Sequence, residues 1–267
     1  MNTFEDIKNR RSVRTFDGEP LADGMAESIL ACARAAENPY ALPIEWCLLS
    51  AKRDGLSVPV IVGADTYLAG KMKAEPHAEE AFGYSFEHVV LTAQSLGIGT
   101  TIIAGTMDRA GFERAVGLAE GEVMPCVSPL GCPAKKLSVR EAMMRKGVKA
   151  DSRLPFEELF FDGSFDKPLT PEGAGVLRQP LEAVRLAPSA VNKQPWRVVL
   201  CGDYAHFYEQ PSKERTGWDI QKVDIGIAMC HFVTALHELG GTATFALDDP
   251  GLNAPQGAVY IASYRVQ

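Results

Sequence analysis

The sequence predicts an α+β fold made of two related halves around one core. Along its 267 residues, apolar residues at helical spacing alternate with short apolar runs of strand length. A series of landmarks in the first half returns in the same order in the second, and no long linker separates the two. We place the halves at residues 1–163 and 164–267. Each half offers only a few strands and helices, so we expect one composite core and not two independent domains.

The first half begins with a short helix that Thr3 can cap. A longer helix is predicted over residues 25–36, and Pro39 and Pro43 end it. The remaining predicted elements of this half are a buried helix at 86–96, an apolar run at 98–103, a short helix at 112–118, and strands at 46–49, 58–62 and 123–130.

The second half repeats this order. Its predicted elements are a helix at 181–186, a strand at 196–200, a strand near Phe207, a buried helix at 225–239 and a closing strand at 258–264. Three pairs of landmarks give similar offsets: 148 residues for Pro20 and Pro168, 150 for Trp46 and Trp196, and 143 for Leu96 and Leu239. These offsets indicate an internal duplication, although two halves of any α+β chain can show such landmarks by chance.

Composition excludes several classes of protein. The net charge of −7 leaves no basic surplus for nucleic acid. No apolar run approaches the ~18 residues of a membrane span, and the first residues lack the apolar segment of a secretory signal. The six cysteines form no CxxC pair and have no histidines at zinc-finger spacing. We therefore expect a cytoplasmic protein with reduced thiols, no structural metal and no membrane partner.

Two segments carry polar groups suited to a ligand. The first is Arg10, Arg11, Ser12 and Arg14, whose guanidinium groups and hydroxyl can grip a phosphate. The alternative is a solvated basic helix end. The second is residues 187–196, where prolines fix the backbone and a serine and two carboxamides can face a planar heterocycle. Its alternative is a plain helix-to-strand connection with a core tryptophan.

Together these segments resemble the nitroreductase family of FMN-dependent enzymes. That family opens with Arg-Arg/His-Ser-x-Arg/Lys-x-Phe and carries Ala-Pro-Ser-x-x-Asn-x-Gln-Pro-Trp after its next helix. Residues 96–105, 127–133 and 152–158 are similar to its Leu-Gly-Leu-Gly-Thr, Val-x-Pro-Leu-Gly-Tyr-Pro and Arg-x-Pro-Leu-Glu-Glu motifs. The chain also resembles the divergent branch called putative TM nitroreductases. The resemblance implies antiparallel central sheets flanked by helices, with FMN as cofactor and NAD(P)H as electron donor.

The order of the motifs departs from the family pattern. Where the family has its Pro-Ser-x-x-Asn loop, residues 36–46 hold a degenerate copy, and the complete copy lies in the second half, which has no Arg-Arg-Ser. Family members are homodimers that bind FMN between subunits, the phosphate on one subunit and the loop on the other. The resemblance therefore implies a monomer acting as a pseudo-dimer, with one complete site and one decayed site.

The resemblance also assigns roles by position. Arg10, Arg11, Ser12, Arg14 and Arg153 would hold the phosphate; Pro188, Ser189, Ala190 and Asn192 would contact the isoalloxazine; and the backbone of Ile103, Ala104 and Gly105 would approach flavin N5. The family often has a lysine two residues before the late arginine. Here that residue is Asp151, and Lys149 is the nearest substitute.

The implied activity is reduction of small organic acceptors, such as nitroaromatics or quinones, by ping-pong hydride transfer from NAD(P)H. The flavin carries this chemistry, so we assign no catalytic side chain. One alternative is a flavin-binding sensor, storage protein or pseudoenzyme without turnover. Another is a different FMN-dependent redox enzyme. A Rossmann domain is disfavoured because no GxGxxG follows a strand and opens a helix.

Overall fold

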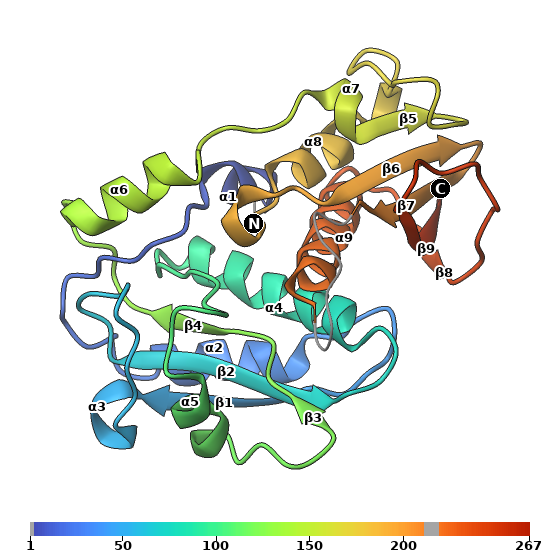
Figure 1. Ribbon diagram of the computed structural model, residues 1–267. Coiled ribbons are helices and arrows are strands. Elements are labelled where there is room, and N and C mark those ends of the chain that lie inside the picture. The colour runs from blue at the N-terminus through green and yellow to red at the C-terminus, as the bar shows by residue number, and fades with distance from the viewer. Residues whose placement is uncertain (1–2, 211–218) are drawn as a thin grey trace.

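The computed structural model describes residues 3–210 and 219–267 and shows two sheets with helices packed between and around them (Figure 1). The first sheet contains β1 (Glu45–Ser50), β2 (Thr66–Lys73), β3 (Glu122–Val123) and β4 (Val127–Leu130), and β2 pairs antiparallel with the other three. The second sheet has the order β5 (Phe160–Asp162), β6 (Trp196–Cys201), β7 (Tyr204–Glu209), β9 (Val259–Val266), β8 (Ala243–Ala246). Only the β5–β6 pair among these strands is parallel. The antiparallel architecture is confirmed.

The described helices are α1 (Thr3–Asn9), α2 (Met25–Ala35), α3 (Ala51–Asp54), α4 (Ala78–Ser95), α5 (Arg109–Ala115), α6 (Val139–Gly147), α7 (Phe156–Leu159), α8 (Arg178–Leu186) and α9 (Ile220–Glu238), with short 3₁₀ turns η1 (Gly175–Leu177) and η2 (Ala190–Asn192). Helices α4 and α9 pack against each other in the middle of the molecule. Both are buried around most of their circumference, as expected of central helices that have apolar residues on every side.

A glycine on each central helix allows the two backbones to approach closely. A Cβ atom on Gly83 would lie 2.1 Å from the carbonyl oxygen of Val223, and one on Gly226 would lie 2.0 Å from that of Glu80. Each glycine therefore faces the residue that precedes the other glycine by three positions. Such a reciprocal contact is the pattern that a two-fold axis produces at an isologous interface. The 143-residue offset between the glycines equals that between Leu96 and Leu239.

The two halves also share an order of elements and a pairing pattern. In the first half a helix, two antiparallel strands, a long helix and a returning strand follow as α2, β1, β2, α4 and β4. In the second half the same series is α8, β6, β7, α9 and β9. One hydrophobic cluster contains Trp46 and Phe82 from the first half together with Trp196 and Phe207 from the second. The halves thus form a pseudo-dimer around a shared core.

Several predicted elements were misplaced. The strand predicted at 58–62 is wrong: this segment forms a turn around Pro59, and the strand lies later, at β2. Within β2, Gly70 interrupts the apolar pattern because the Trp46 ring occupies the space beside it, with Cε3 2.6 Å from where a Cβ would be. The strand predicted at 123–130 is divided into β3 and β4, with Pro125 between them. Helix α6 and strands β5 and β8 were not predicted from the sequence.

Candidate functional site

The arginine-rich segment leaves α1 and runs beside the apolar segment at 98–103. Ser12 forms a parallel bridge with Thr100, and the Val13 amide donates to the Thr100 carbonyl oxygen at 2.9 Å. The amide of Ile103 and the amide of Val127 each donate to the other residue's carbonyl oxygen at 2.9 Å, which fixes the segment along β4. Two of the predicted groups, Ser12 and Ile103, therefore lie on adjacent stretches of backbone.

Arg10 reaches a buried polar network between the central helices. Its side chain is 6% exposed, and its Nε lies 3.9 Å from Glu87 Oε1 on α4. The same carboxylate oxygen lies 2.8 Å from His231 Nε2 on α9, and His231 Nδ1 lies 2.8 Å from the Ala183 carbonyl oxygen. A carbonyl oxygen only accepts, so Nδ1 carries a proton and a second proton is shared between Nε2 and Glu87. Both ring nitrogens of His231 are thus committed to the fold.

Arg153 comes close enough to Arg10 for the two charges to interact. Burial lowers the pKa of Arg153, and the positive charge of Arg10 lowers it further. Its Nη1 donates to the carbonyl oxygens of Ala150 and Ser152, and its Nη2 donates to that of Leu186 at 3.2 Å. The predicted partners Arg10 and Arg153, 143 residues apart in the sequence, are therefore close enough for the charge of one to act on the other.

Arg11 and Arg14 lie next to α6, where Glu141 is fully buried. The Arg14 amide donates to Glu141 Oε2 at 3.2 Å, and Arg11 Nη1 lies 4.0 Å from Glu141 Oε1. Burial lowers the pKa of Arg14, Glu141 opposes this change, and Arg145 adds to it. Arg145 also lowers the pKa of Arg10 and forms an ion pair with Asp151. Sequence analysis missed Arg145, which is a further cation of this region.

Three of these arginines have a buried donor with no acceptor. Within residues 3–210 and 219–267, the Nε atoms of Arg10, Arg14 and Arg153 are buried and have no hydrogen-bond partner. A buried donor without an acceptor costs ~1–3 kcal/mol, more when it is charged. An anion with several acceptor oxygens satisfies such donors, and arginine always carries its charge. The cluster therefore fits a phosphate group.

The loop after α8 brings the second half to this cluster. Asn192 Nδ2 donates to the carbonyl oxygens of Lys149 at 2.8 Å and Ser152 at 3.1 Å, directly before Arg153. Gln194 Oε1 accepts from the Leu154 amide at 2.9 Å. Asn192 and Gln194 both have positive φ, 58° and 51°, a conformation that costs energy outside glycine. The loop of the second half is therefore bonded to the backbone on both sides of Arg153.

Within the loop, backbone and side chains are held by the second half. Ser189 Oγ accepts from the Gln194 amide at 2.9 Å, and the Ala190 amide donates to both carboxylate oxygens of Asp224 at 3.0 Å. Asp224 lies on α9 and is fully buried. Its charge adds to the rise that burial causes in the pKa of Cys126, which precedes β4. Asp224 therefore fixes the loop to α9 through the Ala190 amide.

The amides of Ala104 and Gly105 stay available. In the described part of the chain neither amide donates a hydrogen bond. Arg109 fixes the turn that contains them, because its Nη2 donates to the Ala104 carbonyl oxygen at 2.8 Å and its Nη1 to that of Met124 at 2.9 Å. Two free amides on a fixed turn can face the edge of a ligand ring.

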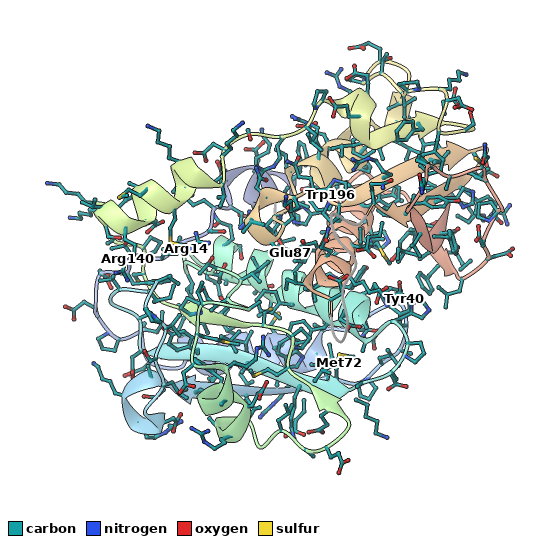
Figure 2. The ribbon with its side chains drawn as sticks, viewed as in Figure 1. Arg14, Tyr40, Met72, Glu87, Arg140 and Trp196 are labelled. Atoms are coloured by element: carbon teal, nitrogen blue, oxygen red, sulfur yellow. The ribbon has the colours of Figure 1, made fainter. Side chains whose placement is uncertain are left out.

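Figure 2 shows Glu87 between Arg14 of the first half and Trp196 of the second, in this view. Trp196 is fully buried in the shared core, which agrees with its interpretation as a core aromatic. No helix among the described residues has the length and apolar character needed to cross a membrane. Among those same residues, no group of three or more His, Cys, Asp or Glu side chains could hold a metal ion.

The pattern of the family described as "Putative TM nitroreductase" matches residues 2–236. The chain belongs to this family. A structure described as a putative nitroreductase from Thermotoga maritima MSB8 is 21% identical, with 99% of this chain and 92% of that chain covered and a TM-score of 0.61. An FMN-dependent nitroreductase from Clostridium difficile R20291 is 16% identical, with 52% of this chain and 90% of that one covered and a TM-score of 0.44. No curated protein matches.

Proposed function

We propose that this chain is an FMN-dependent NAD(P)H oxidoreductase that reduces small organic acceptors such as nitroaromatics or quinones. Family membership supports a redox enzyme of the nitroreductase type. The observation that carries the cofactor is the set of buried, unpartnered Nε donors on Arg10, Arg14 and Arg153. The loop at 187–196 is bonded to the residues on either side of Arg153, and the charge of Arg10 acts on Arg153, which supports a site shared by the two halves.

In this proposal each predicted group has a distinct task. Arg10, Ser12 and Arg153 hold the phosphate, with Arg14 and Arg145 adding positive charge. Pro188, Ser189, Ala190 and Asn192 flank the ring system, and the free amides of Ala104 and Gly105 stabilise negative charge on its edge. Bound FMN supplies the hydride chemistry.

The protein's own residues position groups and exclude water in this scheme. His231, which bonds the same Glu87 oxygen that faces Arg10, has both ring nitrogens in hydrogen bonds and so is not available as a general acid or base. Asp224 fixes the loop through the Ala190 amide, and Glu87 fixes Arg10. Electron donor and acceptor would use the same opening in turn, which gives ping-pong kinetics.

We further propose that the protein arose by internal duplication and acts as a cytoplasmic monomer, with halves at 1–163 and 164–267. The reciprocal contact of Gly83 and Gly226 supports this origin, because a duplicated homodimer subunit would keep the crossing of its interface helices. Size-exclusion chromatography with light scattering should give a single 28.9 kDa species. A stable dimer with each site built from two chains would contradict the monomeric arrangement.

The cofactor assignment is tested by titrating FMN into the purified protein and following flavin fluorescence. Arg10→Ala and Asn192→Ala should each weaken binding about ten- to a hundredfold, since each removes ~1.5–3 kcal/mol of hydrogen bonding to a charged group or of loop support. Arg34→Ala and Lys193→Ala, both at exposed positions, should bind as the unaltered protein does. Arg153→Lys keeps the charge and guards against a folding defect in Arg10→Ala. Unchanged affinity in both site variants would refute the composite site.

Turnover is a separate question from binding. Under anaerobic conditions, NADH or NADPH should bleach the bound flavin, and nitroaromatics or quinones should restore its colour. A protein that binds FMN but is not bleached would be the sensor, storage protein or pseudoenzyme. Bleaching without reoxidation by these acceptors would indicate a different FMN-dependent redox enzyme.

A further inference from the structure

A cavity of about 590 Å³ lies on the α4–α9 pair, away from the arginine cluster. Its walls come from both halves: the end of α2 and the residues that follow it, α4, the C-terminal part of α9, β8 and β9. This volume lies in the usual range of small-molecule sites, ~300–1,000 Å³. No residue predicted for the flavin site lines it.

The pseudo-two-fold relation between the halves maps the surroundings of the arginine segment onto the surroundings of this cavity. The 143-residue offset that relates Gly83 to Gly226 also relates His88 to His231, and Thr100 to Ala243. His231 belongs to the network beside Arg10, and Thr100 pairs with Ser12. Their counterparts His88 and Ala243 both line the cavity. The second half has no Arg-Arg-Ser segment to fill this position.

The electrostatic character of the cavity is opposite to that of the arginine cluster. Among its described lining residues there is no lysine or arginine, and Glu37 carries the one full charge. Burial lowers the pKa of His88; Glu87 opposes the change, while His237 and His231 add to it. The uncharged form of His88 therefore predominates at pH 7, and no described residue of the lining compensates a phosphate dianion.

The chemical lining is aromatic with a few neutral polar groups. Phe245 and Tyr264 pack edge to face at 5.6 Å between ring centroids, and Tyr84 packs against His88 at 5.3 Å. Both His88 and His237 accept hydrogen bonds through their backbone carbonyl oxygens, and in the described part of the chain these bonds leave the two imidazole rings free to face a ligand. Tyr264 is 2% exposed, and its hydroxyl has no partner there either. Aromatic walls with few polar groups are typical of sites for planar ligands.

We propose that this cavity is a second ligand site, which takes an uncharged planar aromatic molecule with carbonyl or hydroxyl groups on its edge and rejects phosphorylated flavins. The imidazoles supply hydrogen bonds to the edge of such a ligand, and the aromatic walls cover its faces. The site does not depend on FMN binding elsewhere, because its walls share no residue with the arginine cluster.

The probe is lumichrome, a neutral three-ring compound without a phosphate. Protein saturated with FMN is titrated with lumichrome by calorimetry, and equilibrium dialysis gives the number bound. We expect one lumichrome per chain with a Kd below ~0.1 mM, the affinity that ordinary ligand efficiency gives for its size. Excess FMN should bind at one equivalent per chain and should not displace lumichrome.

Two variants locate the binding. Ala35 is exposed on α2 and lines the cavity, so Ala35→Trp should fill part of it and weaken lumichrome at least tenfold. Ala31→Trp, one turn earlier on the same helix and outside the cavity, is the matched control. Phe245→Ala, which removes one wall, should also weaken lumichrome about tenfold and guards against misfolding of Ala35→Trp.

Three results would overturn the proposal. They are no binding of lumichrome up to 1 mM (~10 times the expected Kd), equal affinity in the Ala35→Trp and Ala31→Trp proteins, or a second FMN equivalent that Ala35→Trp removes. If the protein binds no FMN at all, the same titration on the purified protein still decides. If lumichrome binds the unaltered protein and Ala35→Trp abolishes this binding, the second site would be supported although the proposed flavin function fails.

Discussion

Replacing Glu87 by glutamine should destabilise the protein strongly, because it removes the buried negative charge that faces Arg10. Glu87 Oε1 lies 3.9 Å from Arg10 Nε, and both side chains are almost fully buried. Two opposite charges at about 4 Å interact by ~4 kcal/mol at an effective dielectric constant of 20. Removing one partner of a buried pair costs ~3–5 kcal/mol, because the other charge remains without compensation. Glutamine keeps a hydrogen bond to His231, so we expect a loss of ~3 kcal/mol.

Urea denaturation at pH 7 measures this loss, with thermal denaturation as a second readout. A loss of ~3 kcal/mol corresponds to a fall in Tm of ~6–12 °C for a protein of this size. The control is Asp162→Asn, which breaks the ion pair between Asp162 and Lys167, two side chains that are 47% and 69% exposed. Exposed pairs contribute ~0–1 kcal/mol, so the control should change stability little.

The reasoning has a clear alternative. If Glu87 holds the shared proton and is uncharged in the folded protein, glutamine is a near-isosteric replacement. The free energy of unfolding lost in Glu87→Gln would then exceed the loss in Asp162→Asn by less than ~1 kcal/mol, since only a hydrogen bond changes. That result would refute the assignment of Glu87 as the charge partner of Arg10.

Three further changes test other parts of the structure. Gly226→Ala should cost at least ~2 kcal/mol by urea denaturation, because its Cβ would lie 2.0 Å from a carbonyl oxygen of α4, whereas Gly147→Ala, which has open space around it, should cost nothing. Burial lowers the pKa of His88 below its unfolded value of ~6.5, so the stability that His88 contributes is present above that pH and is lost as the pH falls. His88→Asn should therefore reduce the loss of stability measured between pH 7 and 5. Asp224→Asn loosens the loop at Ala190, so it should lower the free energy of unfolding by ~1.5–3 kcal/mol and weaken FMN binding about tenfold in the fluorescence titration. An unchanged FMN affinity would show that this support of the loop does not contribute to binding.

The fold class could be predicted because the strongest patterns in the chain are also the central elements. The helices predicted at 86–96 and 225–239 correspond to α4 and α9, whose continuous apolar character reflects their burial between the sheets. The strand at β2 could not be predicted by the same means. Its pattern is broken at Gly70 by the packing of Trp46, a residue distant in the sequence. Such a contact leaves no local signal.

Some residues of the candidate site could be predicted from the sequence and others could not. Segments with unusual composition, such as Arg10 to Arg14 and the loop with Asn192, could be assigned because a family motif stands behind them. Glu87 and Asp224 were missed, although both hold predicted site residues in place. Each is an acidic residue inside an otherwise buried apolar helix, and a buried charge is stable only with a partner. That signal was in the sequence, but the identity of the partner requires the tertiary structure.

The reciprocal crossing of α4 and α9 is compatible with the two chemically different sites proposed above. The crossing of α4 and α9 gives both sides of the molecule similar geometry, since each glycine makes the same contact with the opposite helix. Charge is not constrained by that contact. The first half carries Arg10 and Arg14, whose Nε atoms are buried donors without a partner among the described residues. The second half has no such segment, and the described lining of the cavity beside His88 is aromatic and contains no lysine or arginine. In a homodimer one substitution alters both sites at once. Under the duplication proposed above each half can change alone, and a second site with a different ligand requires this independence.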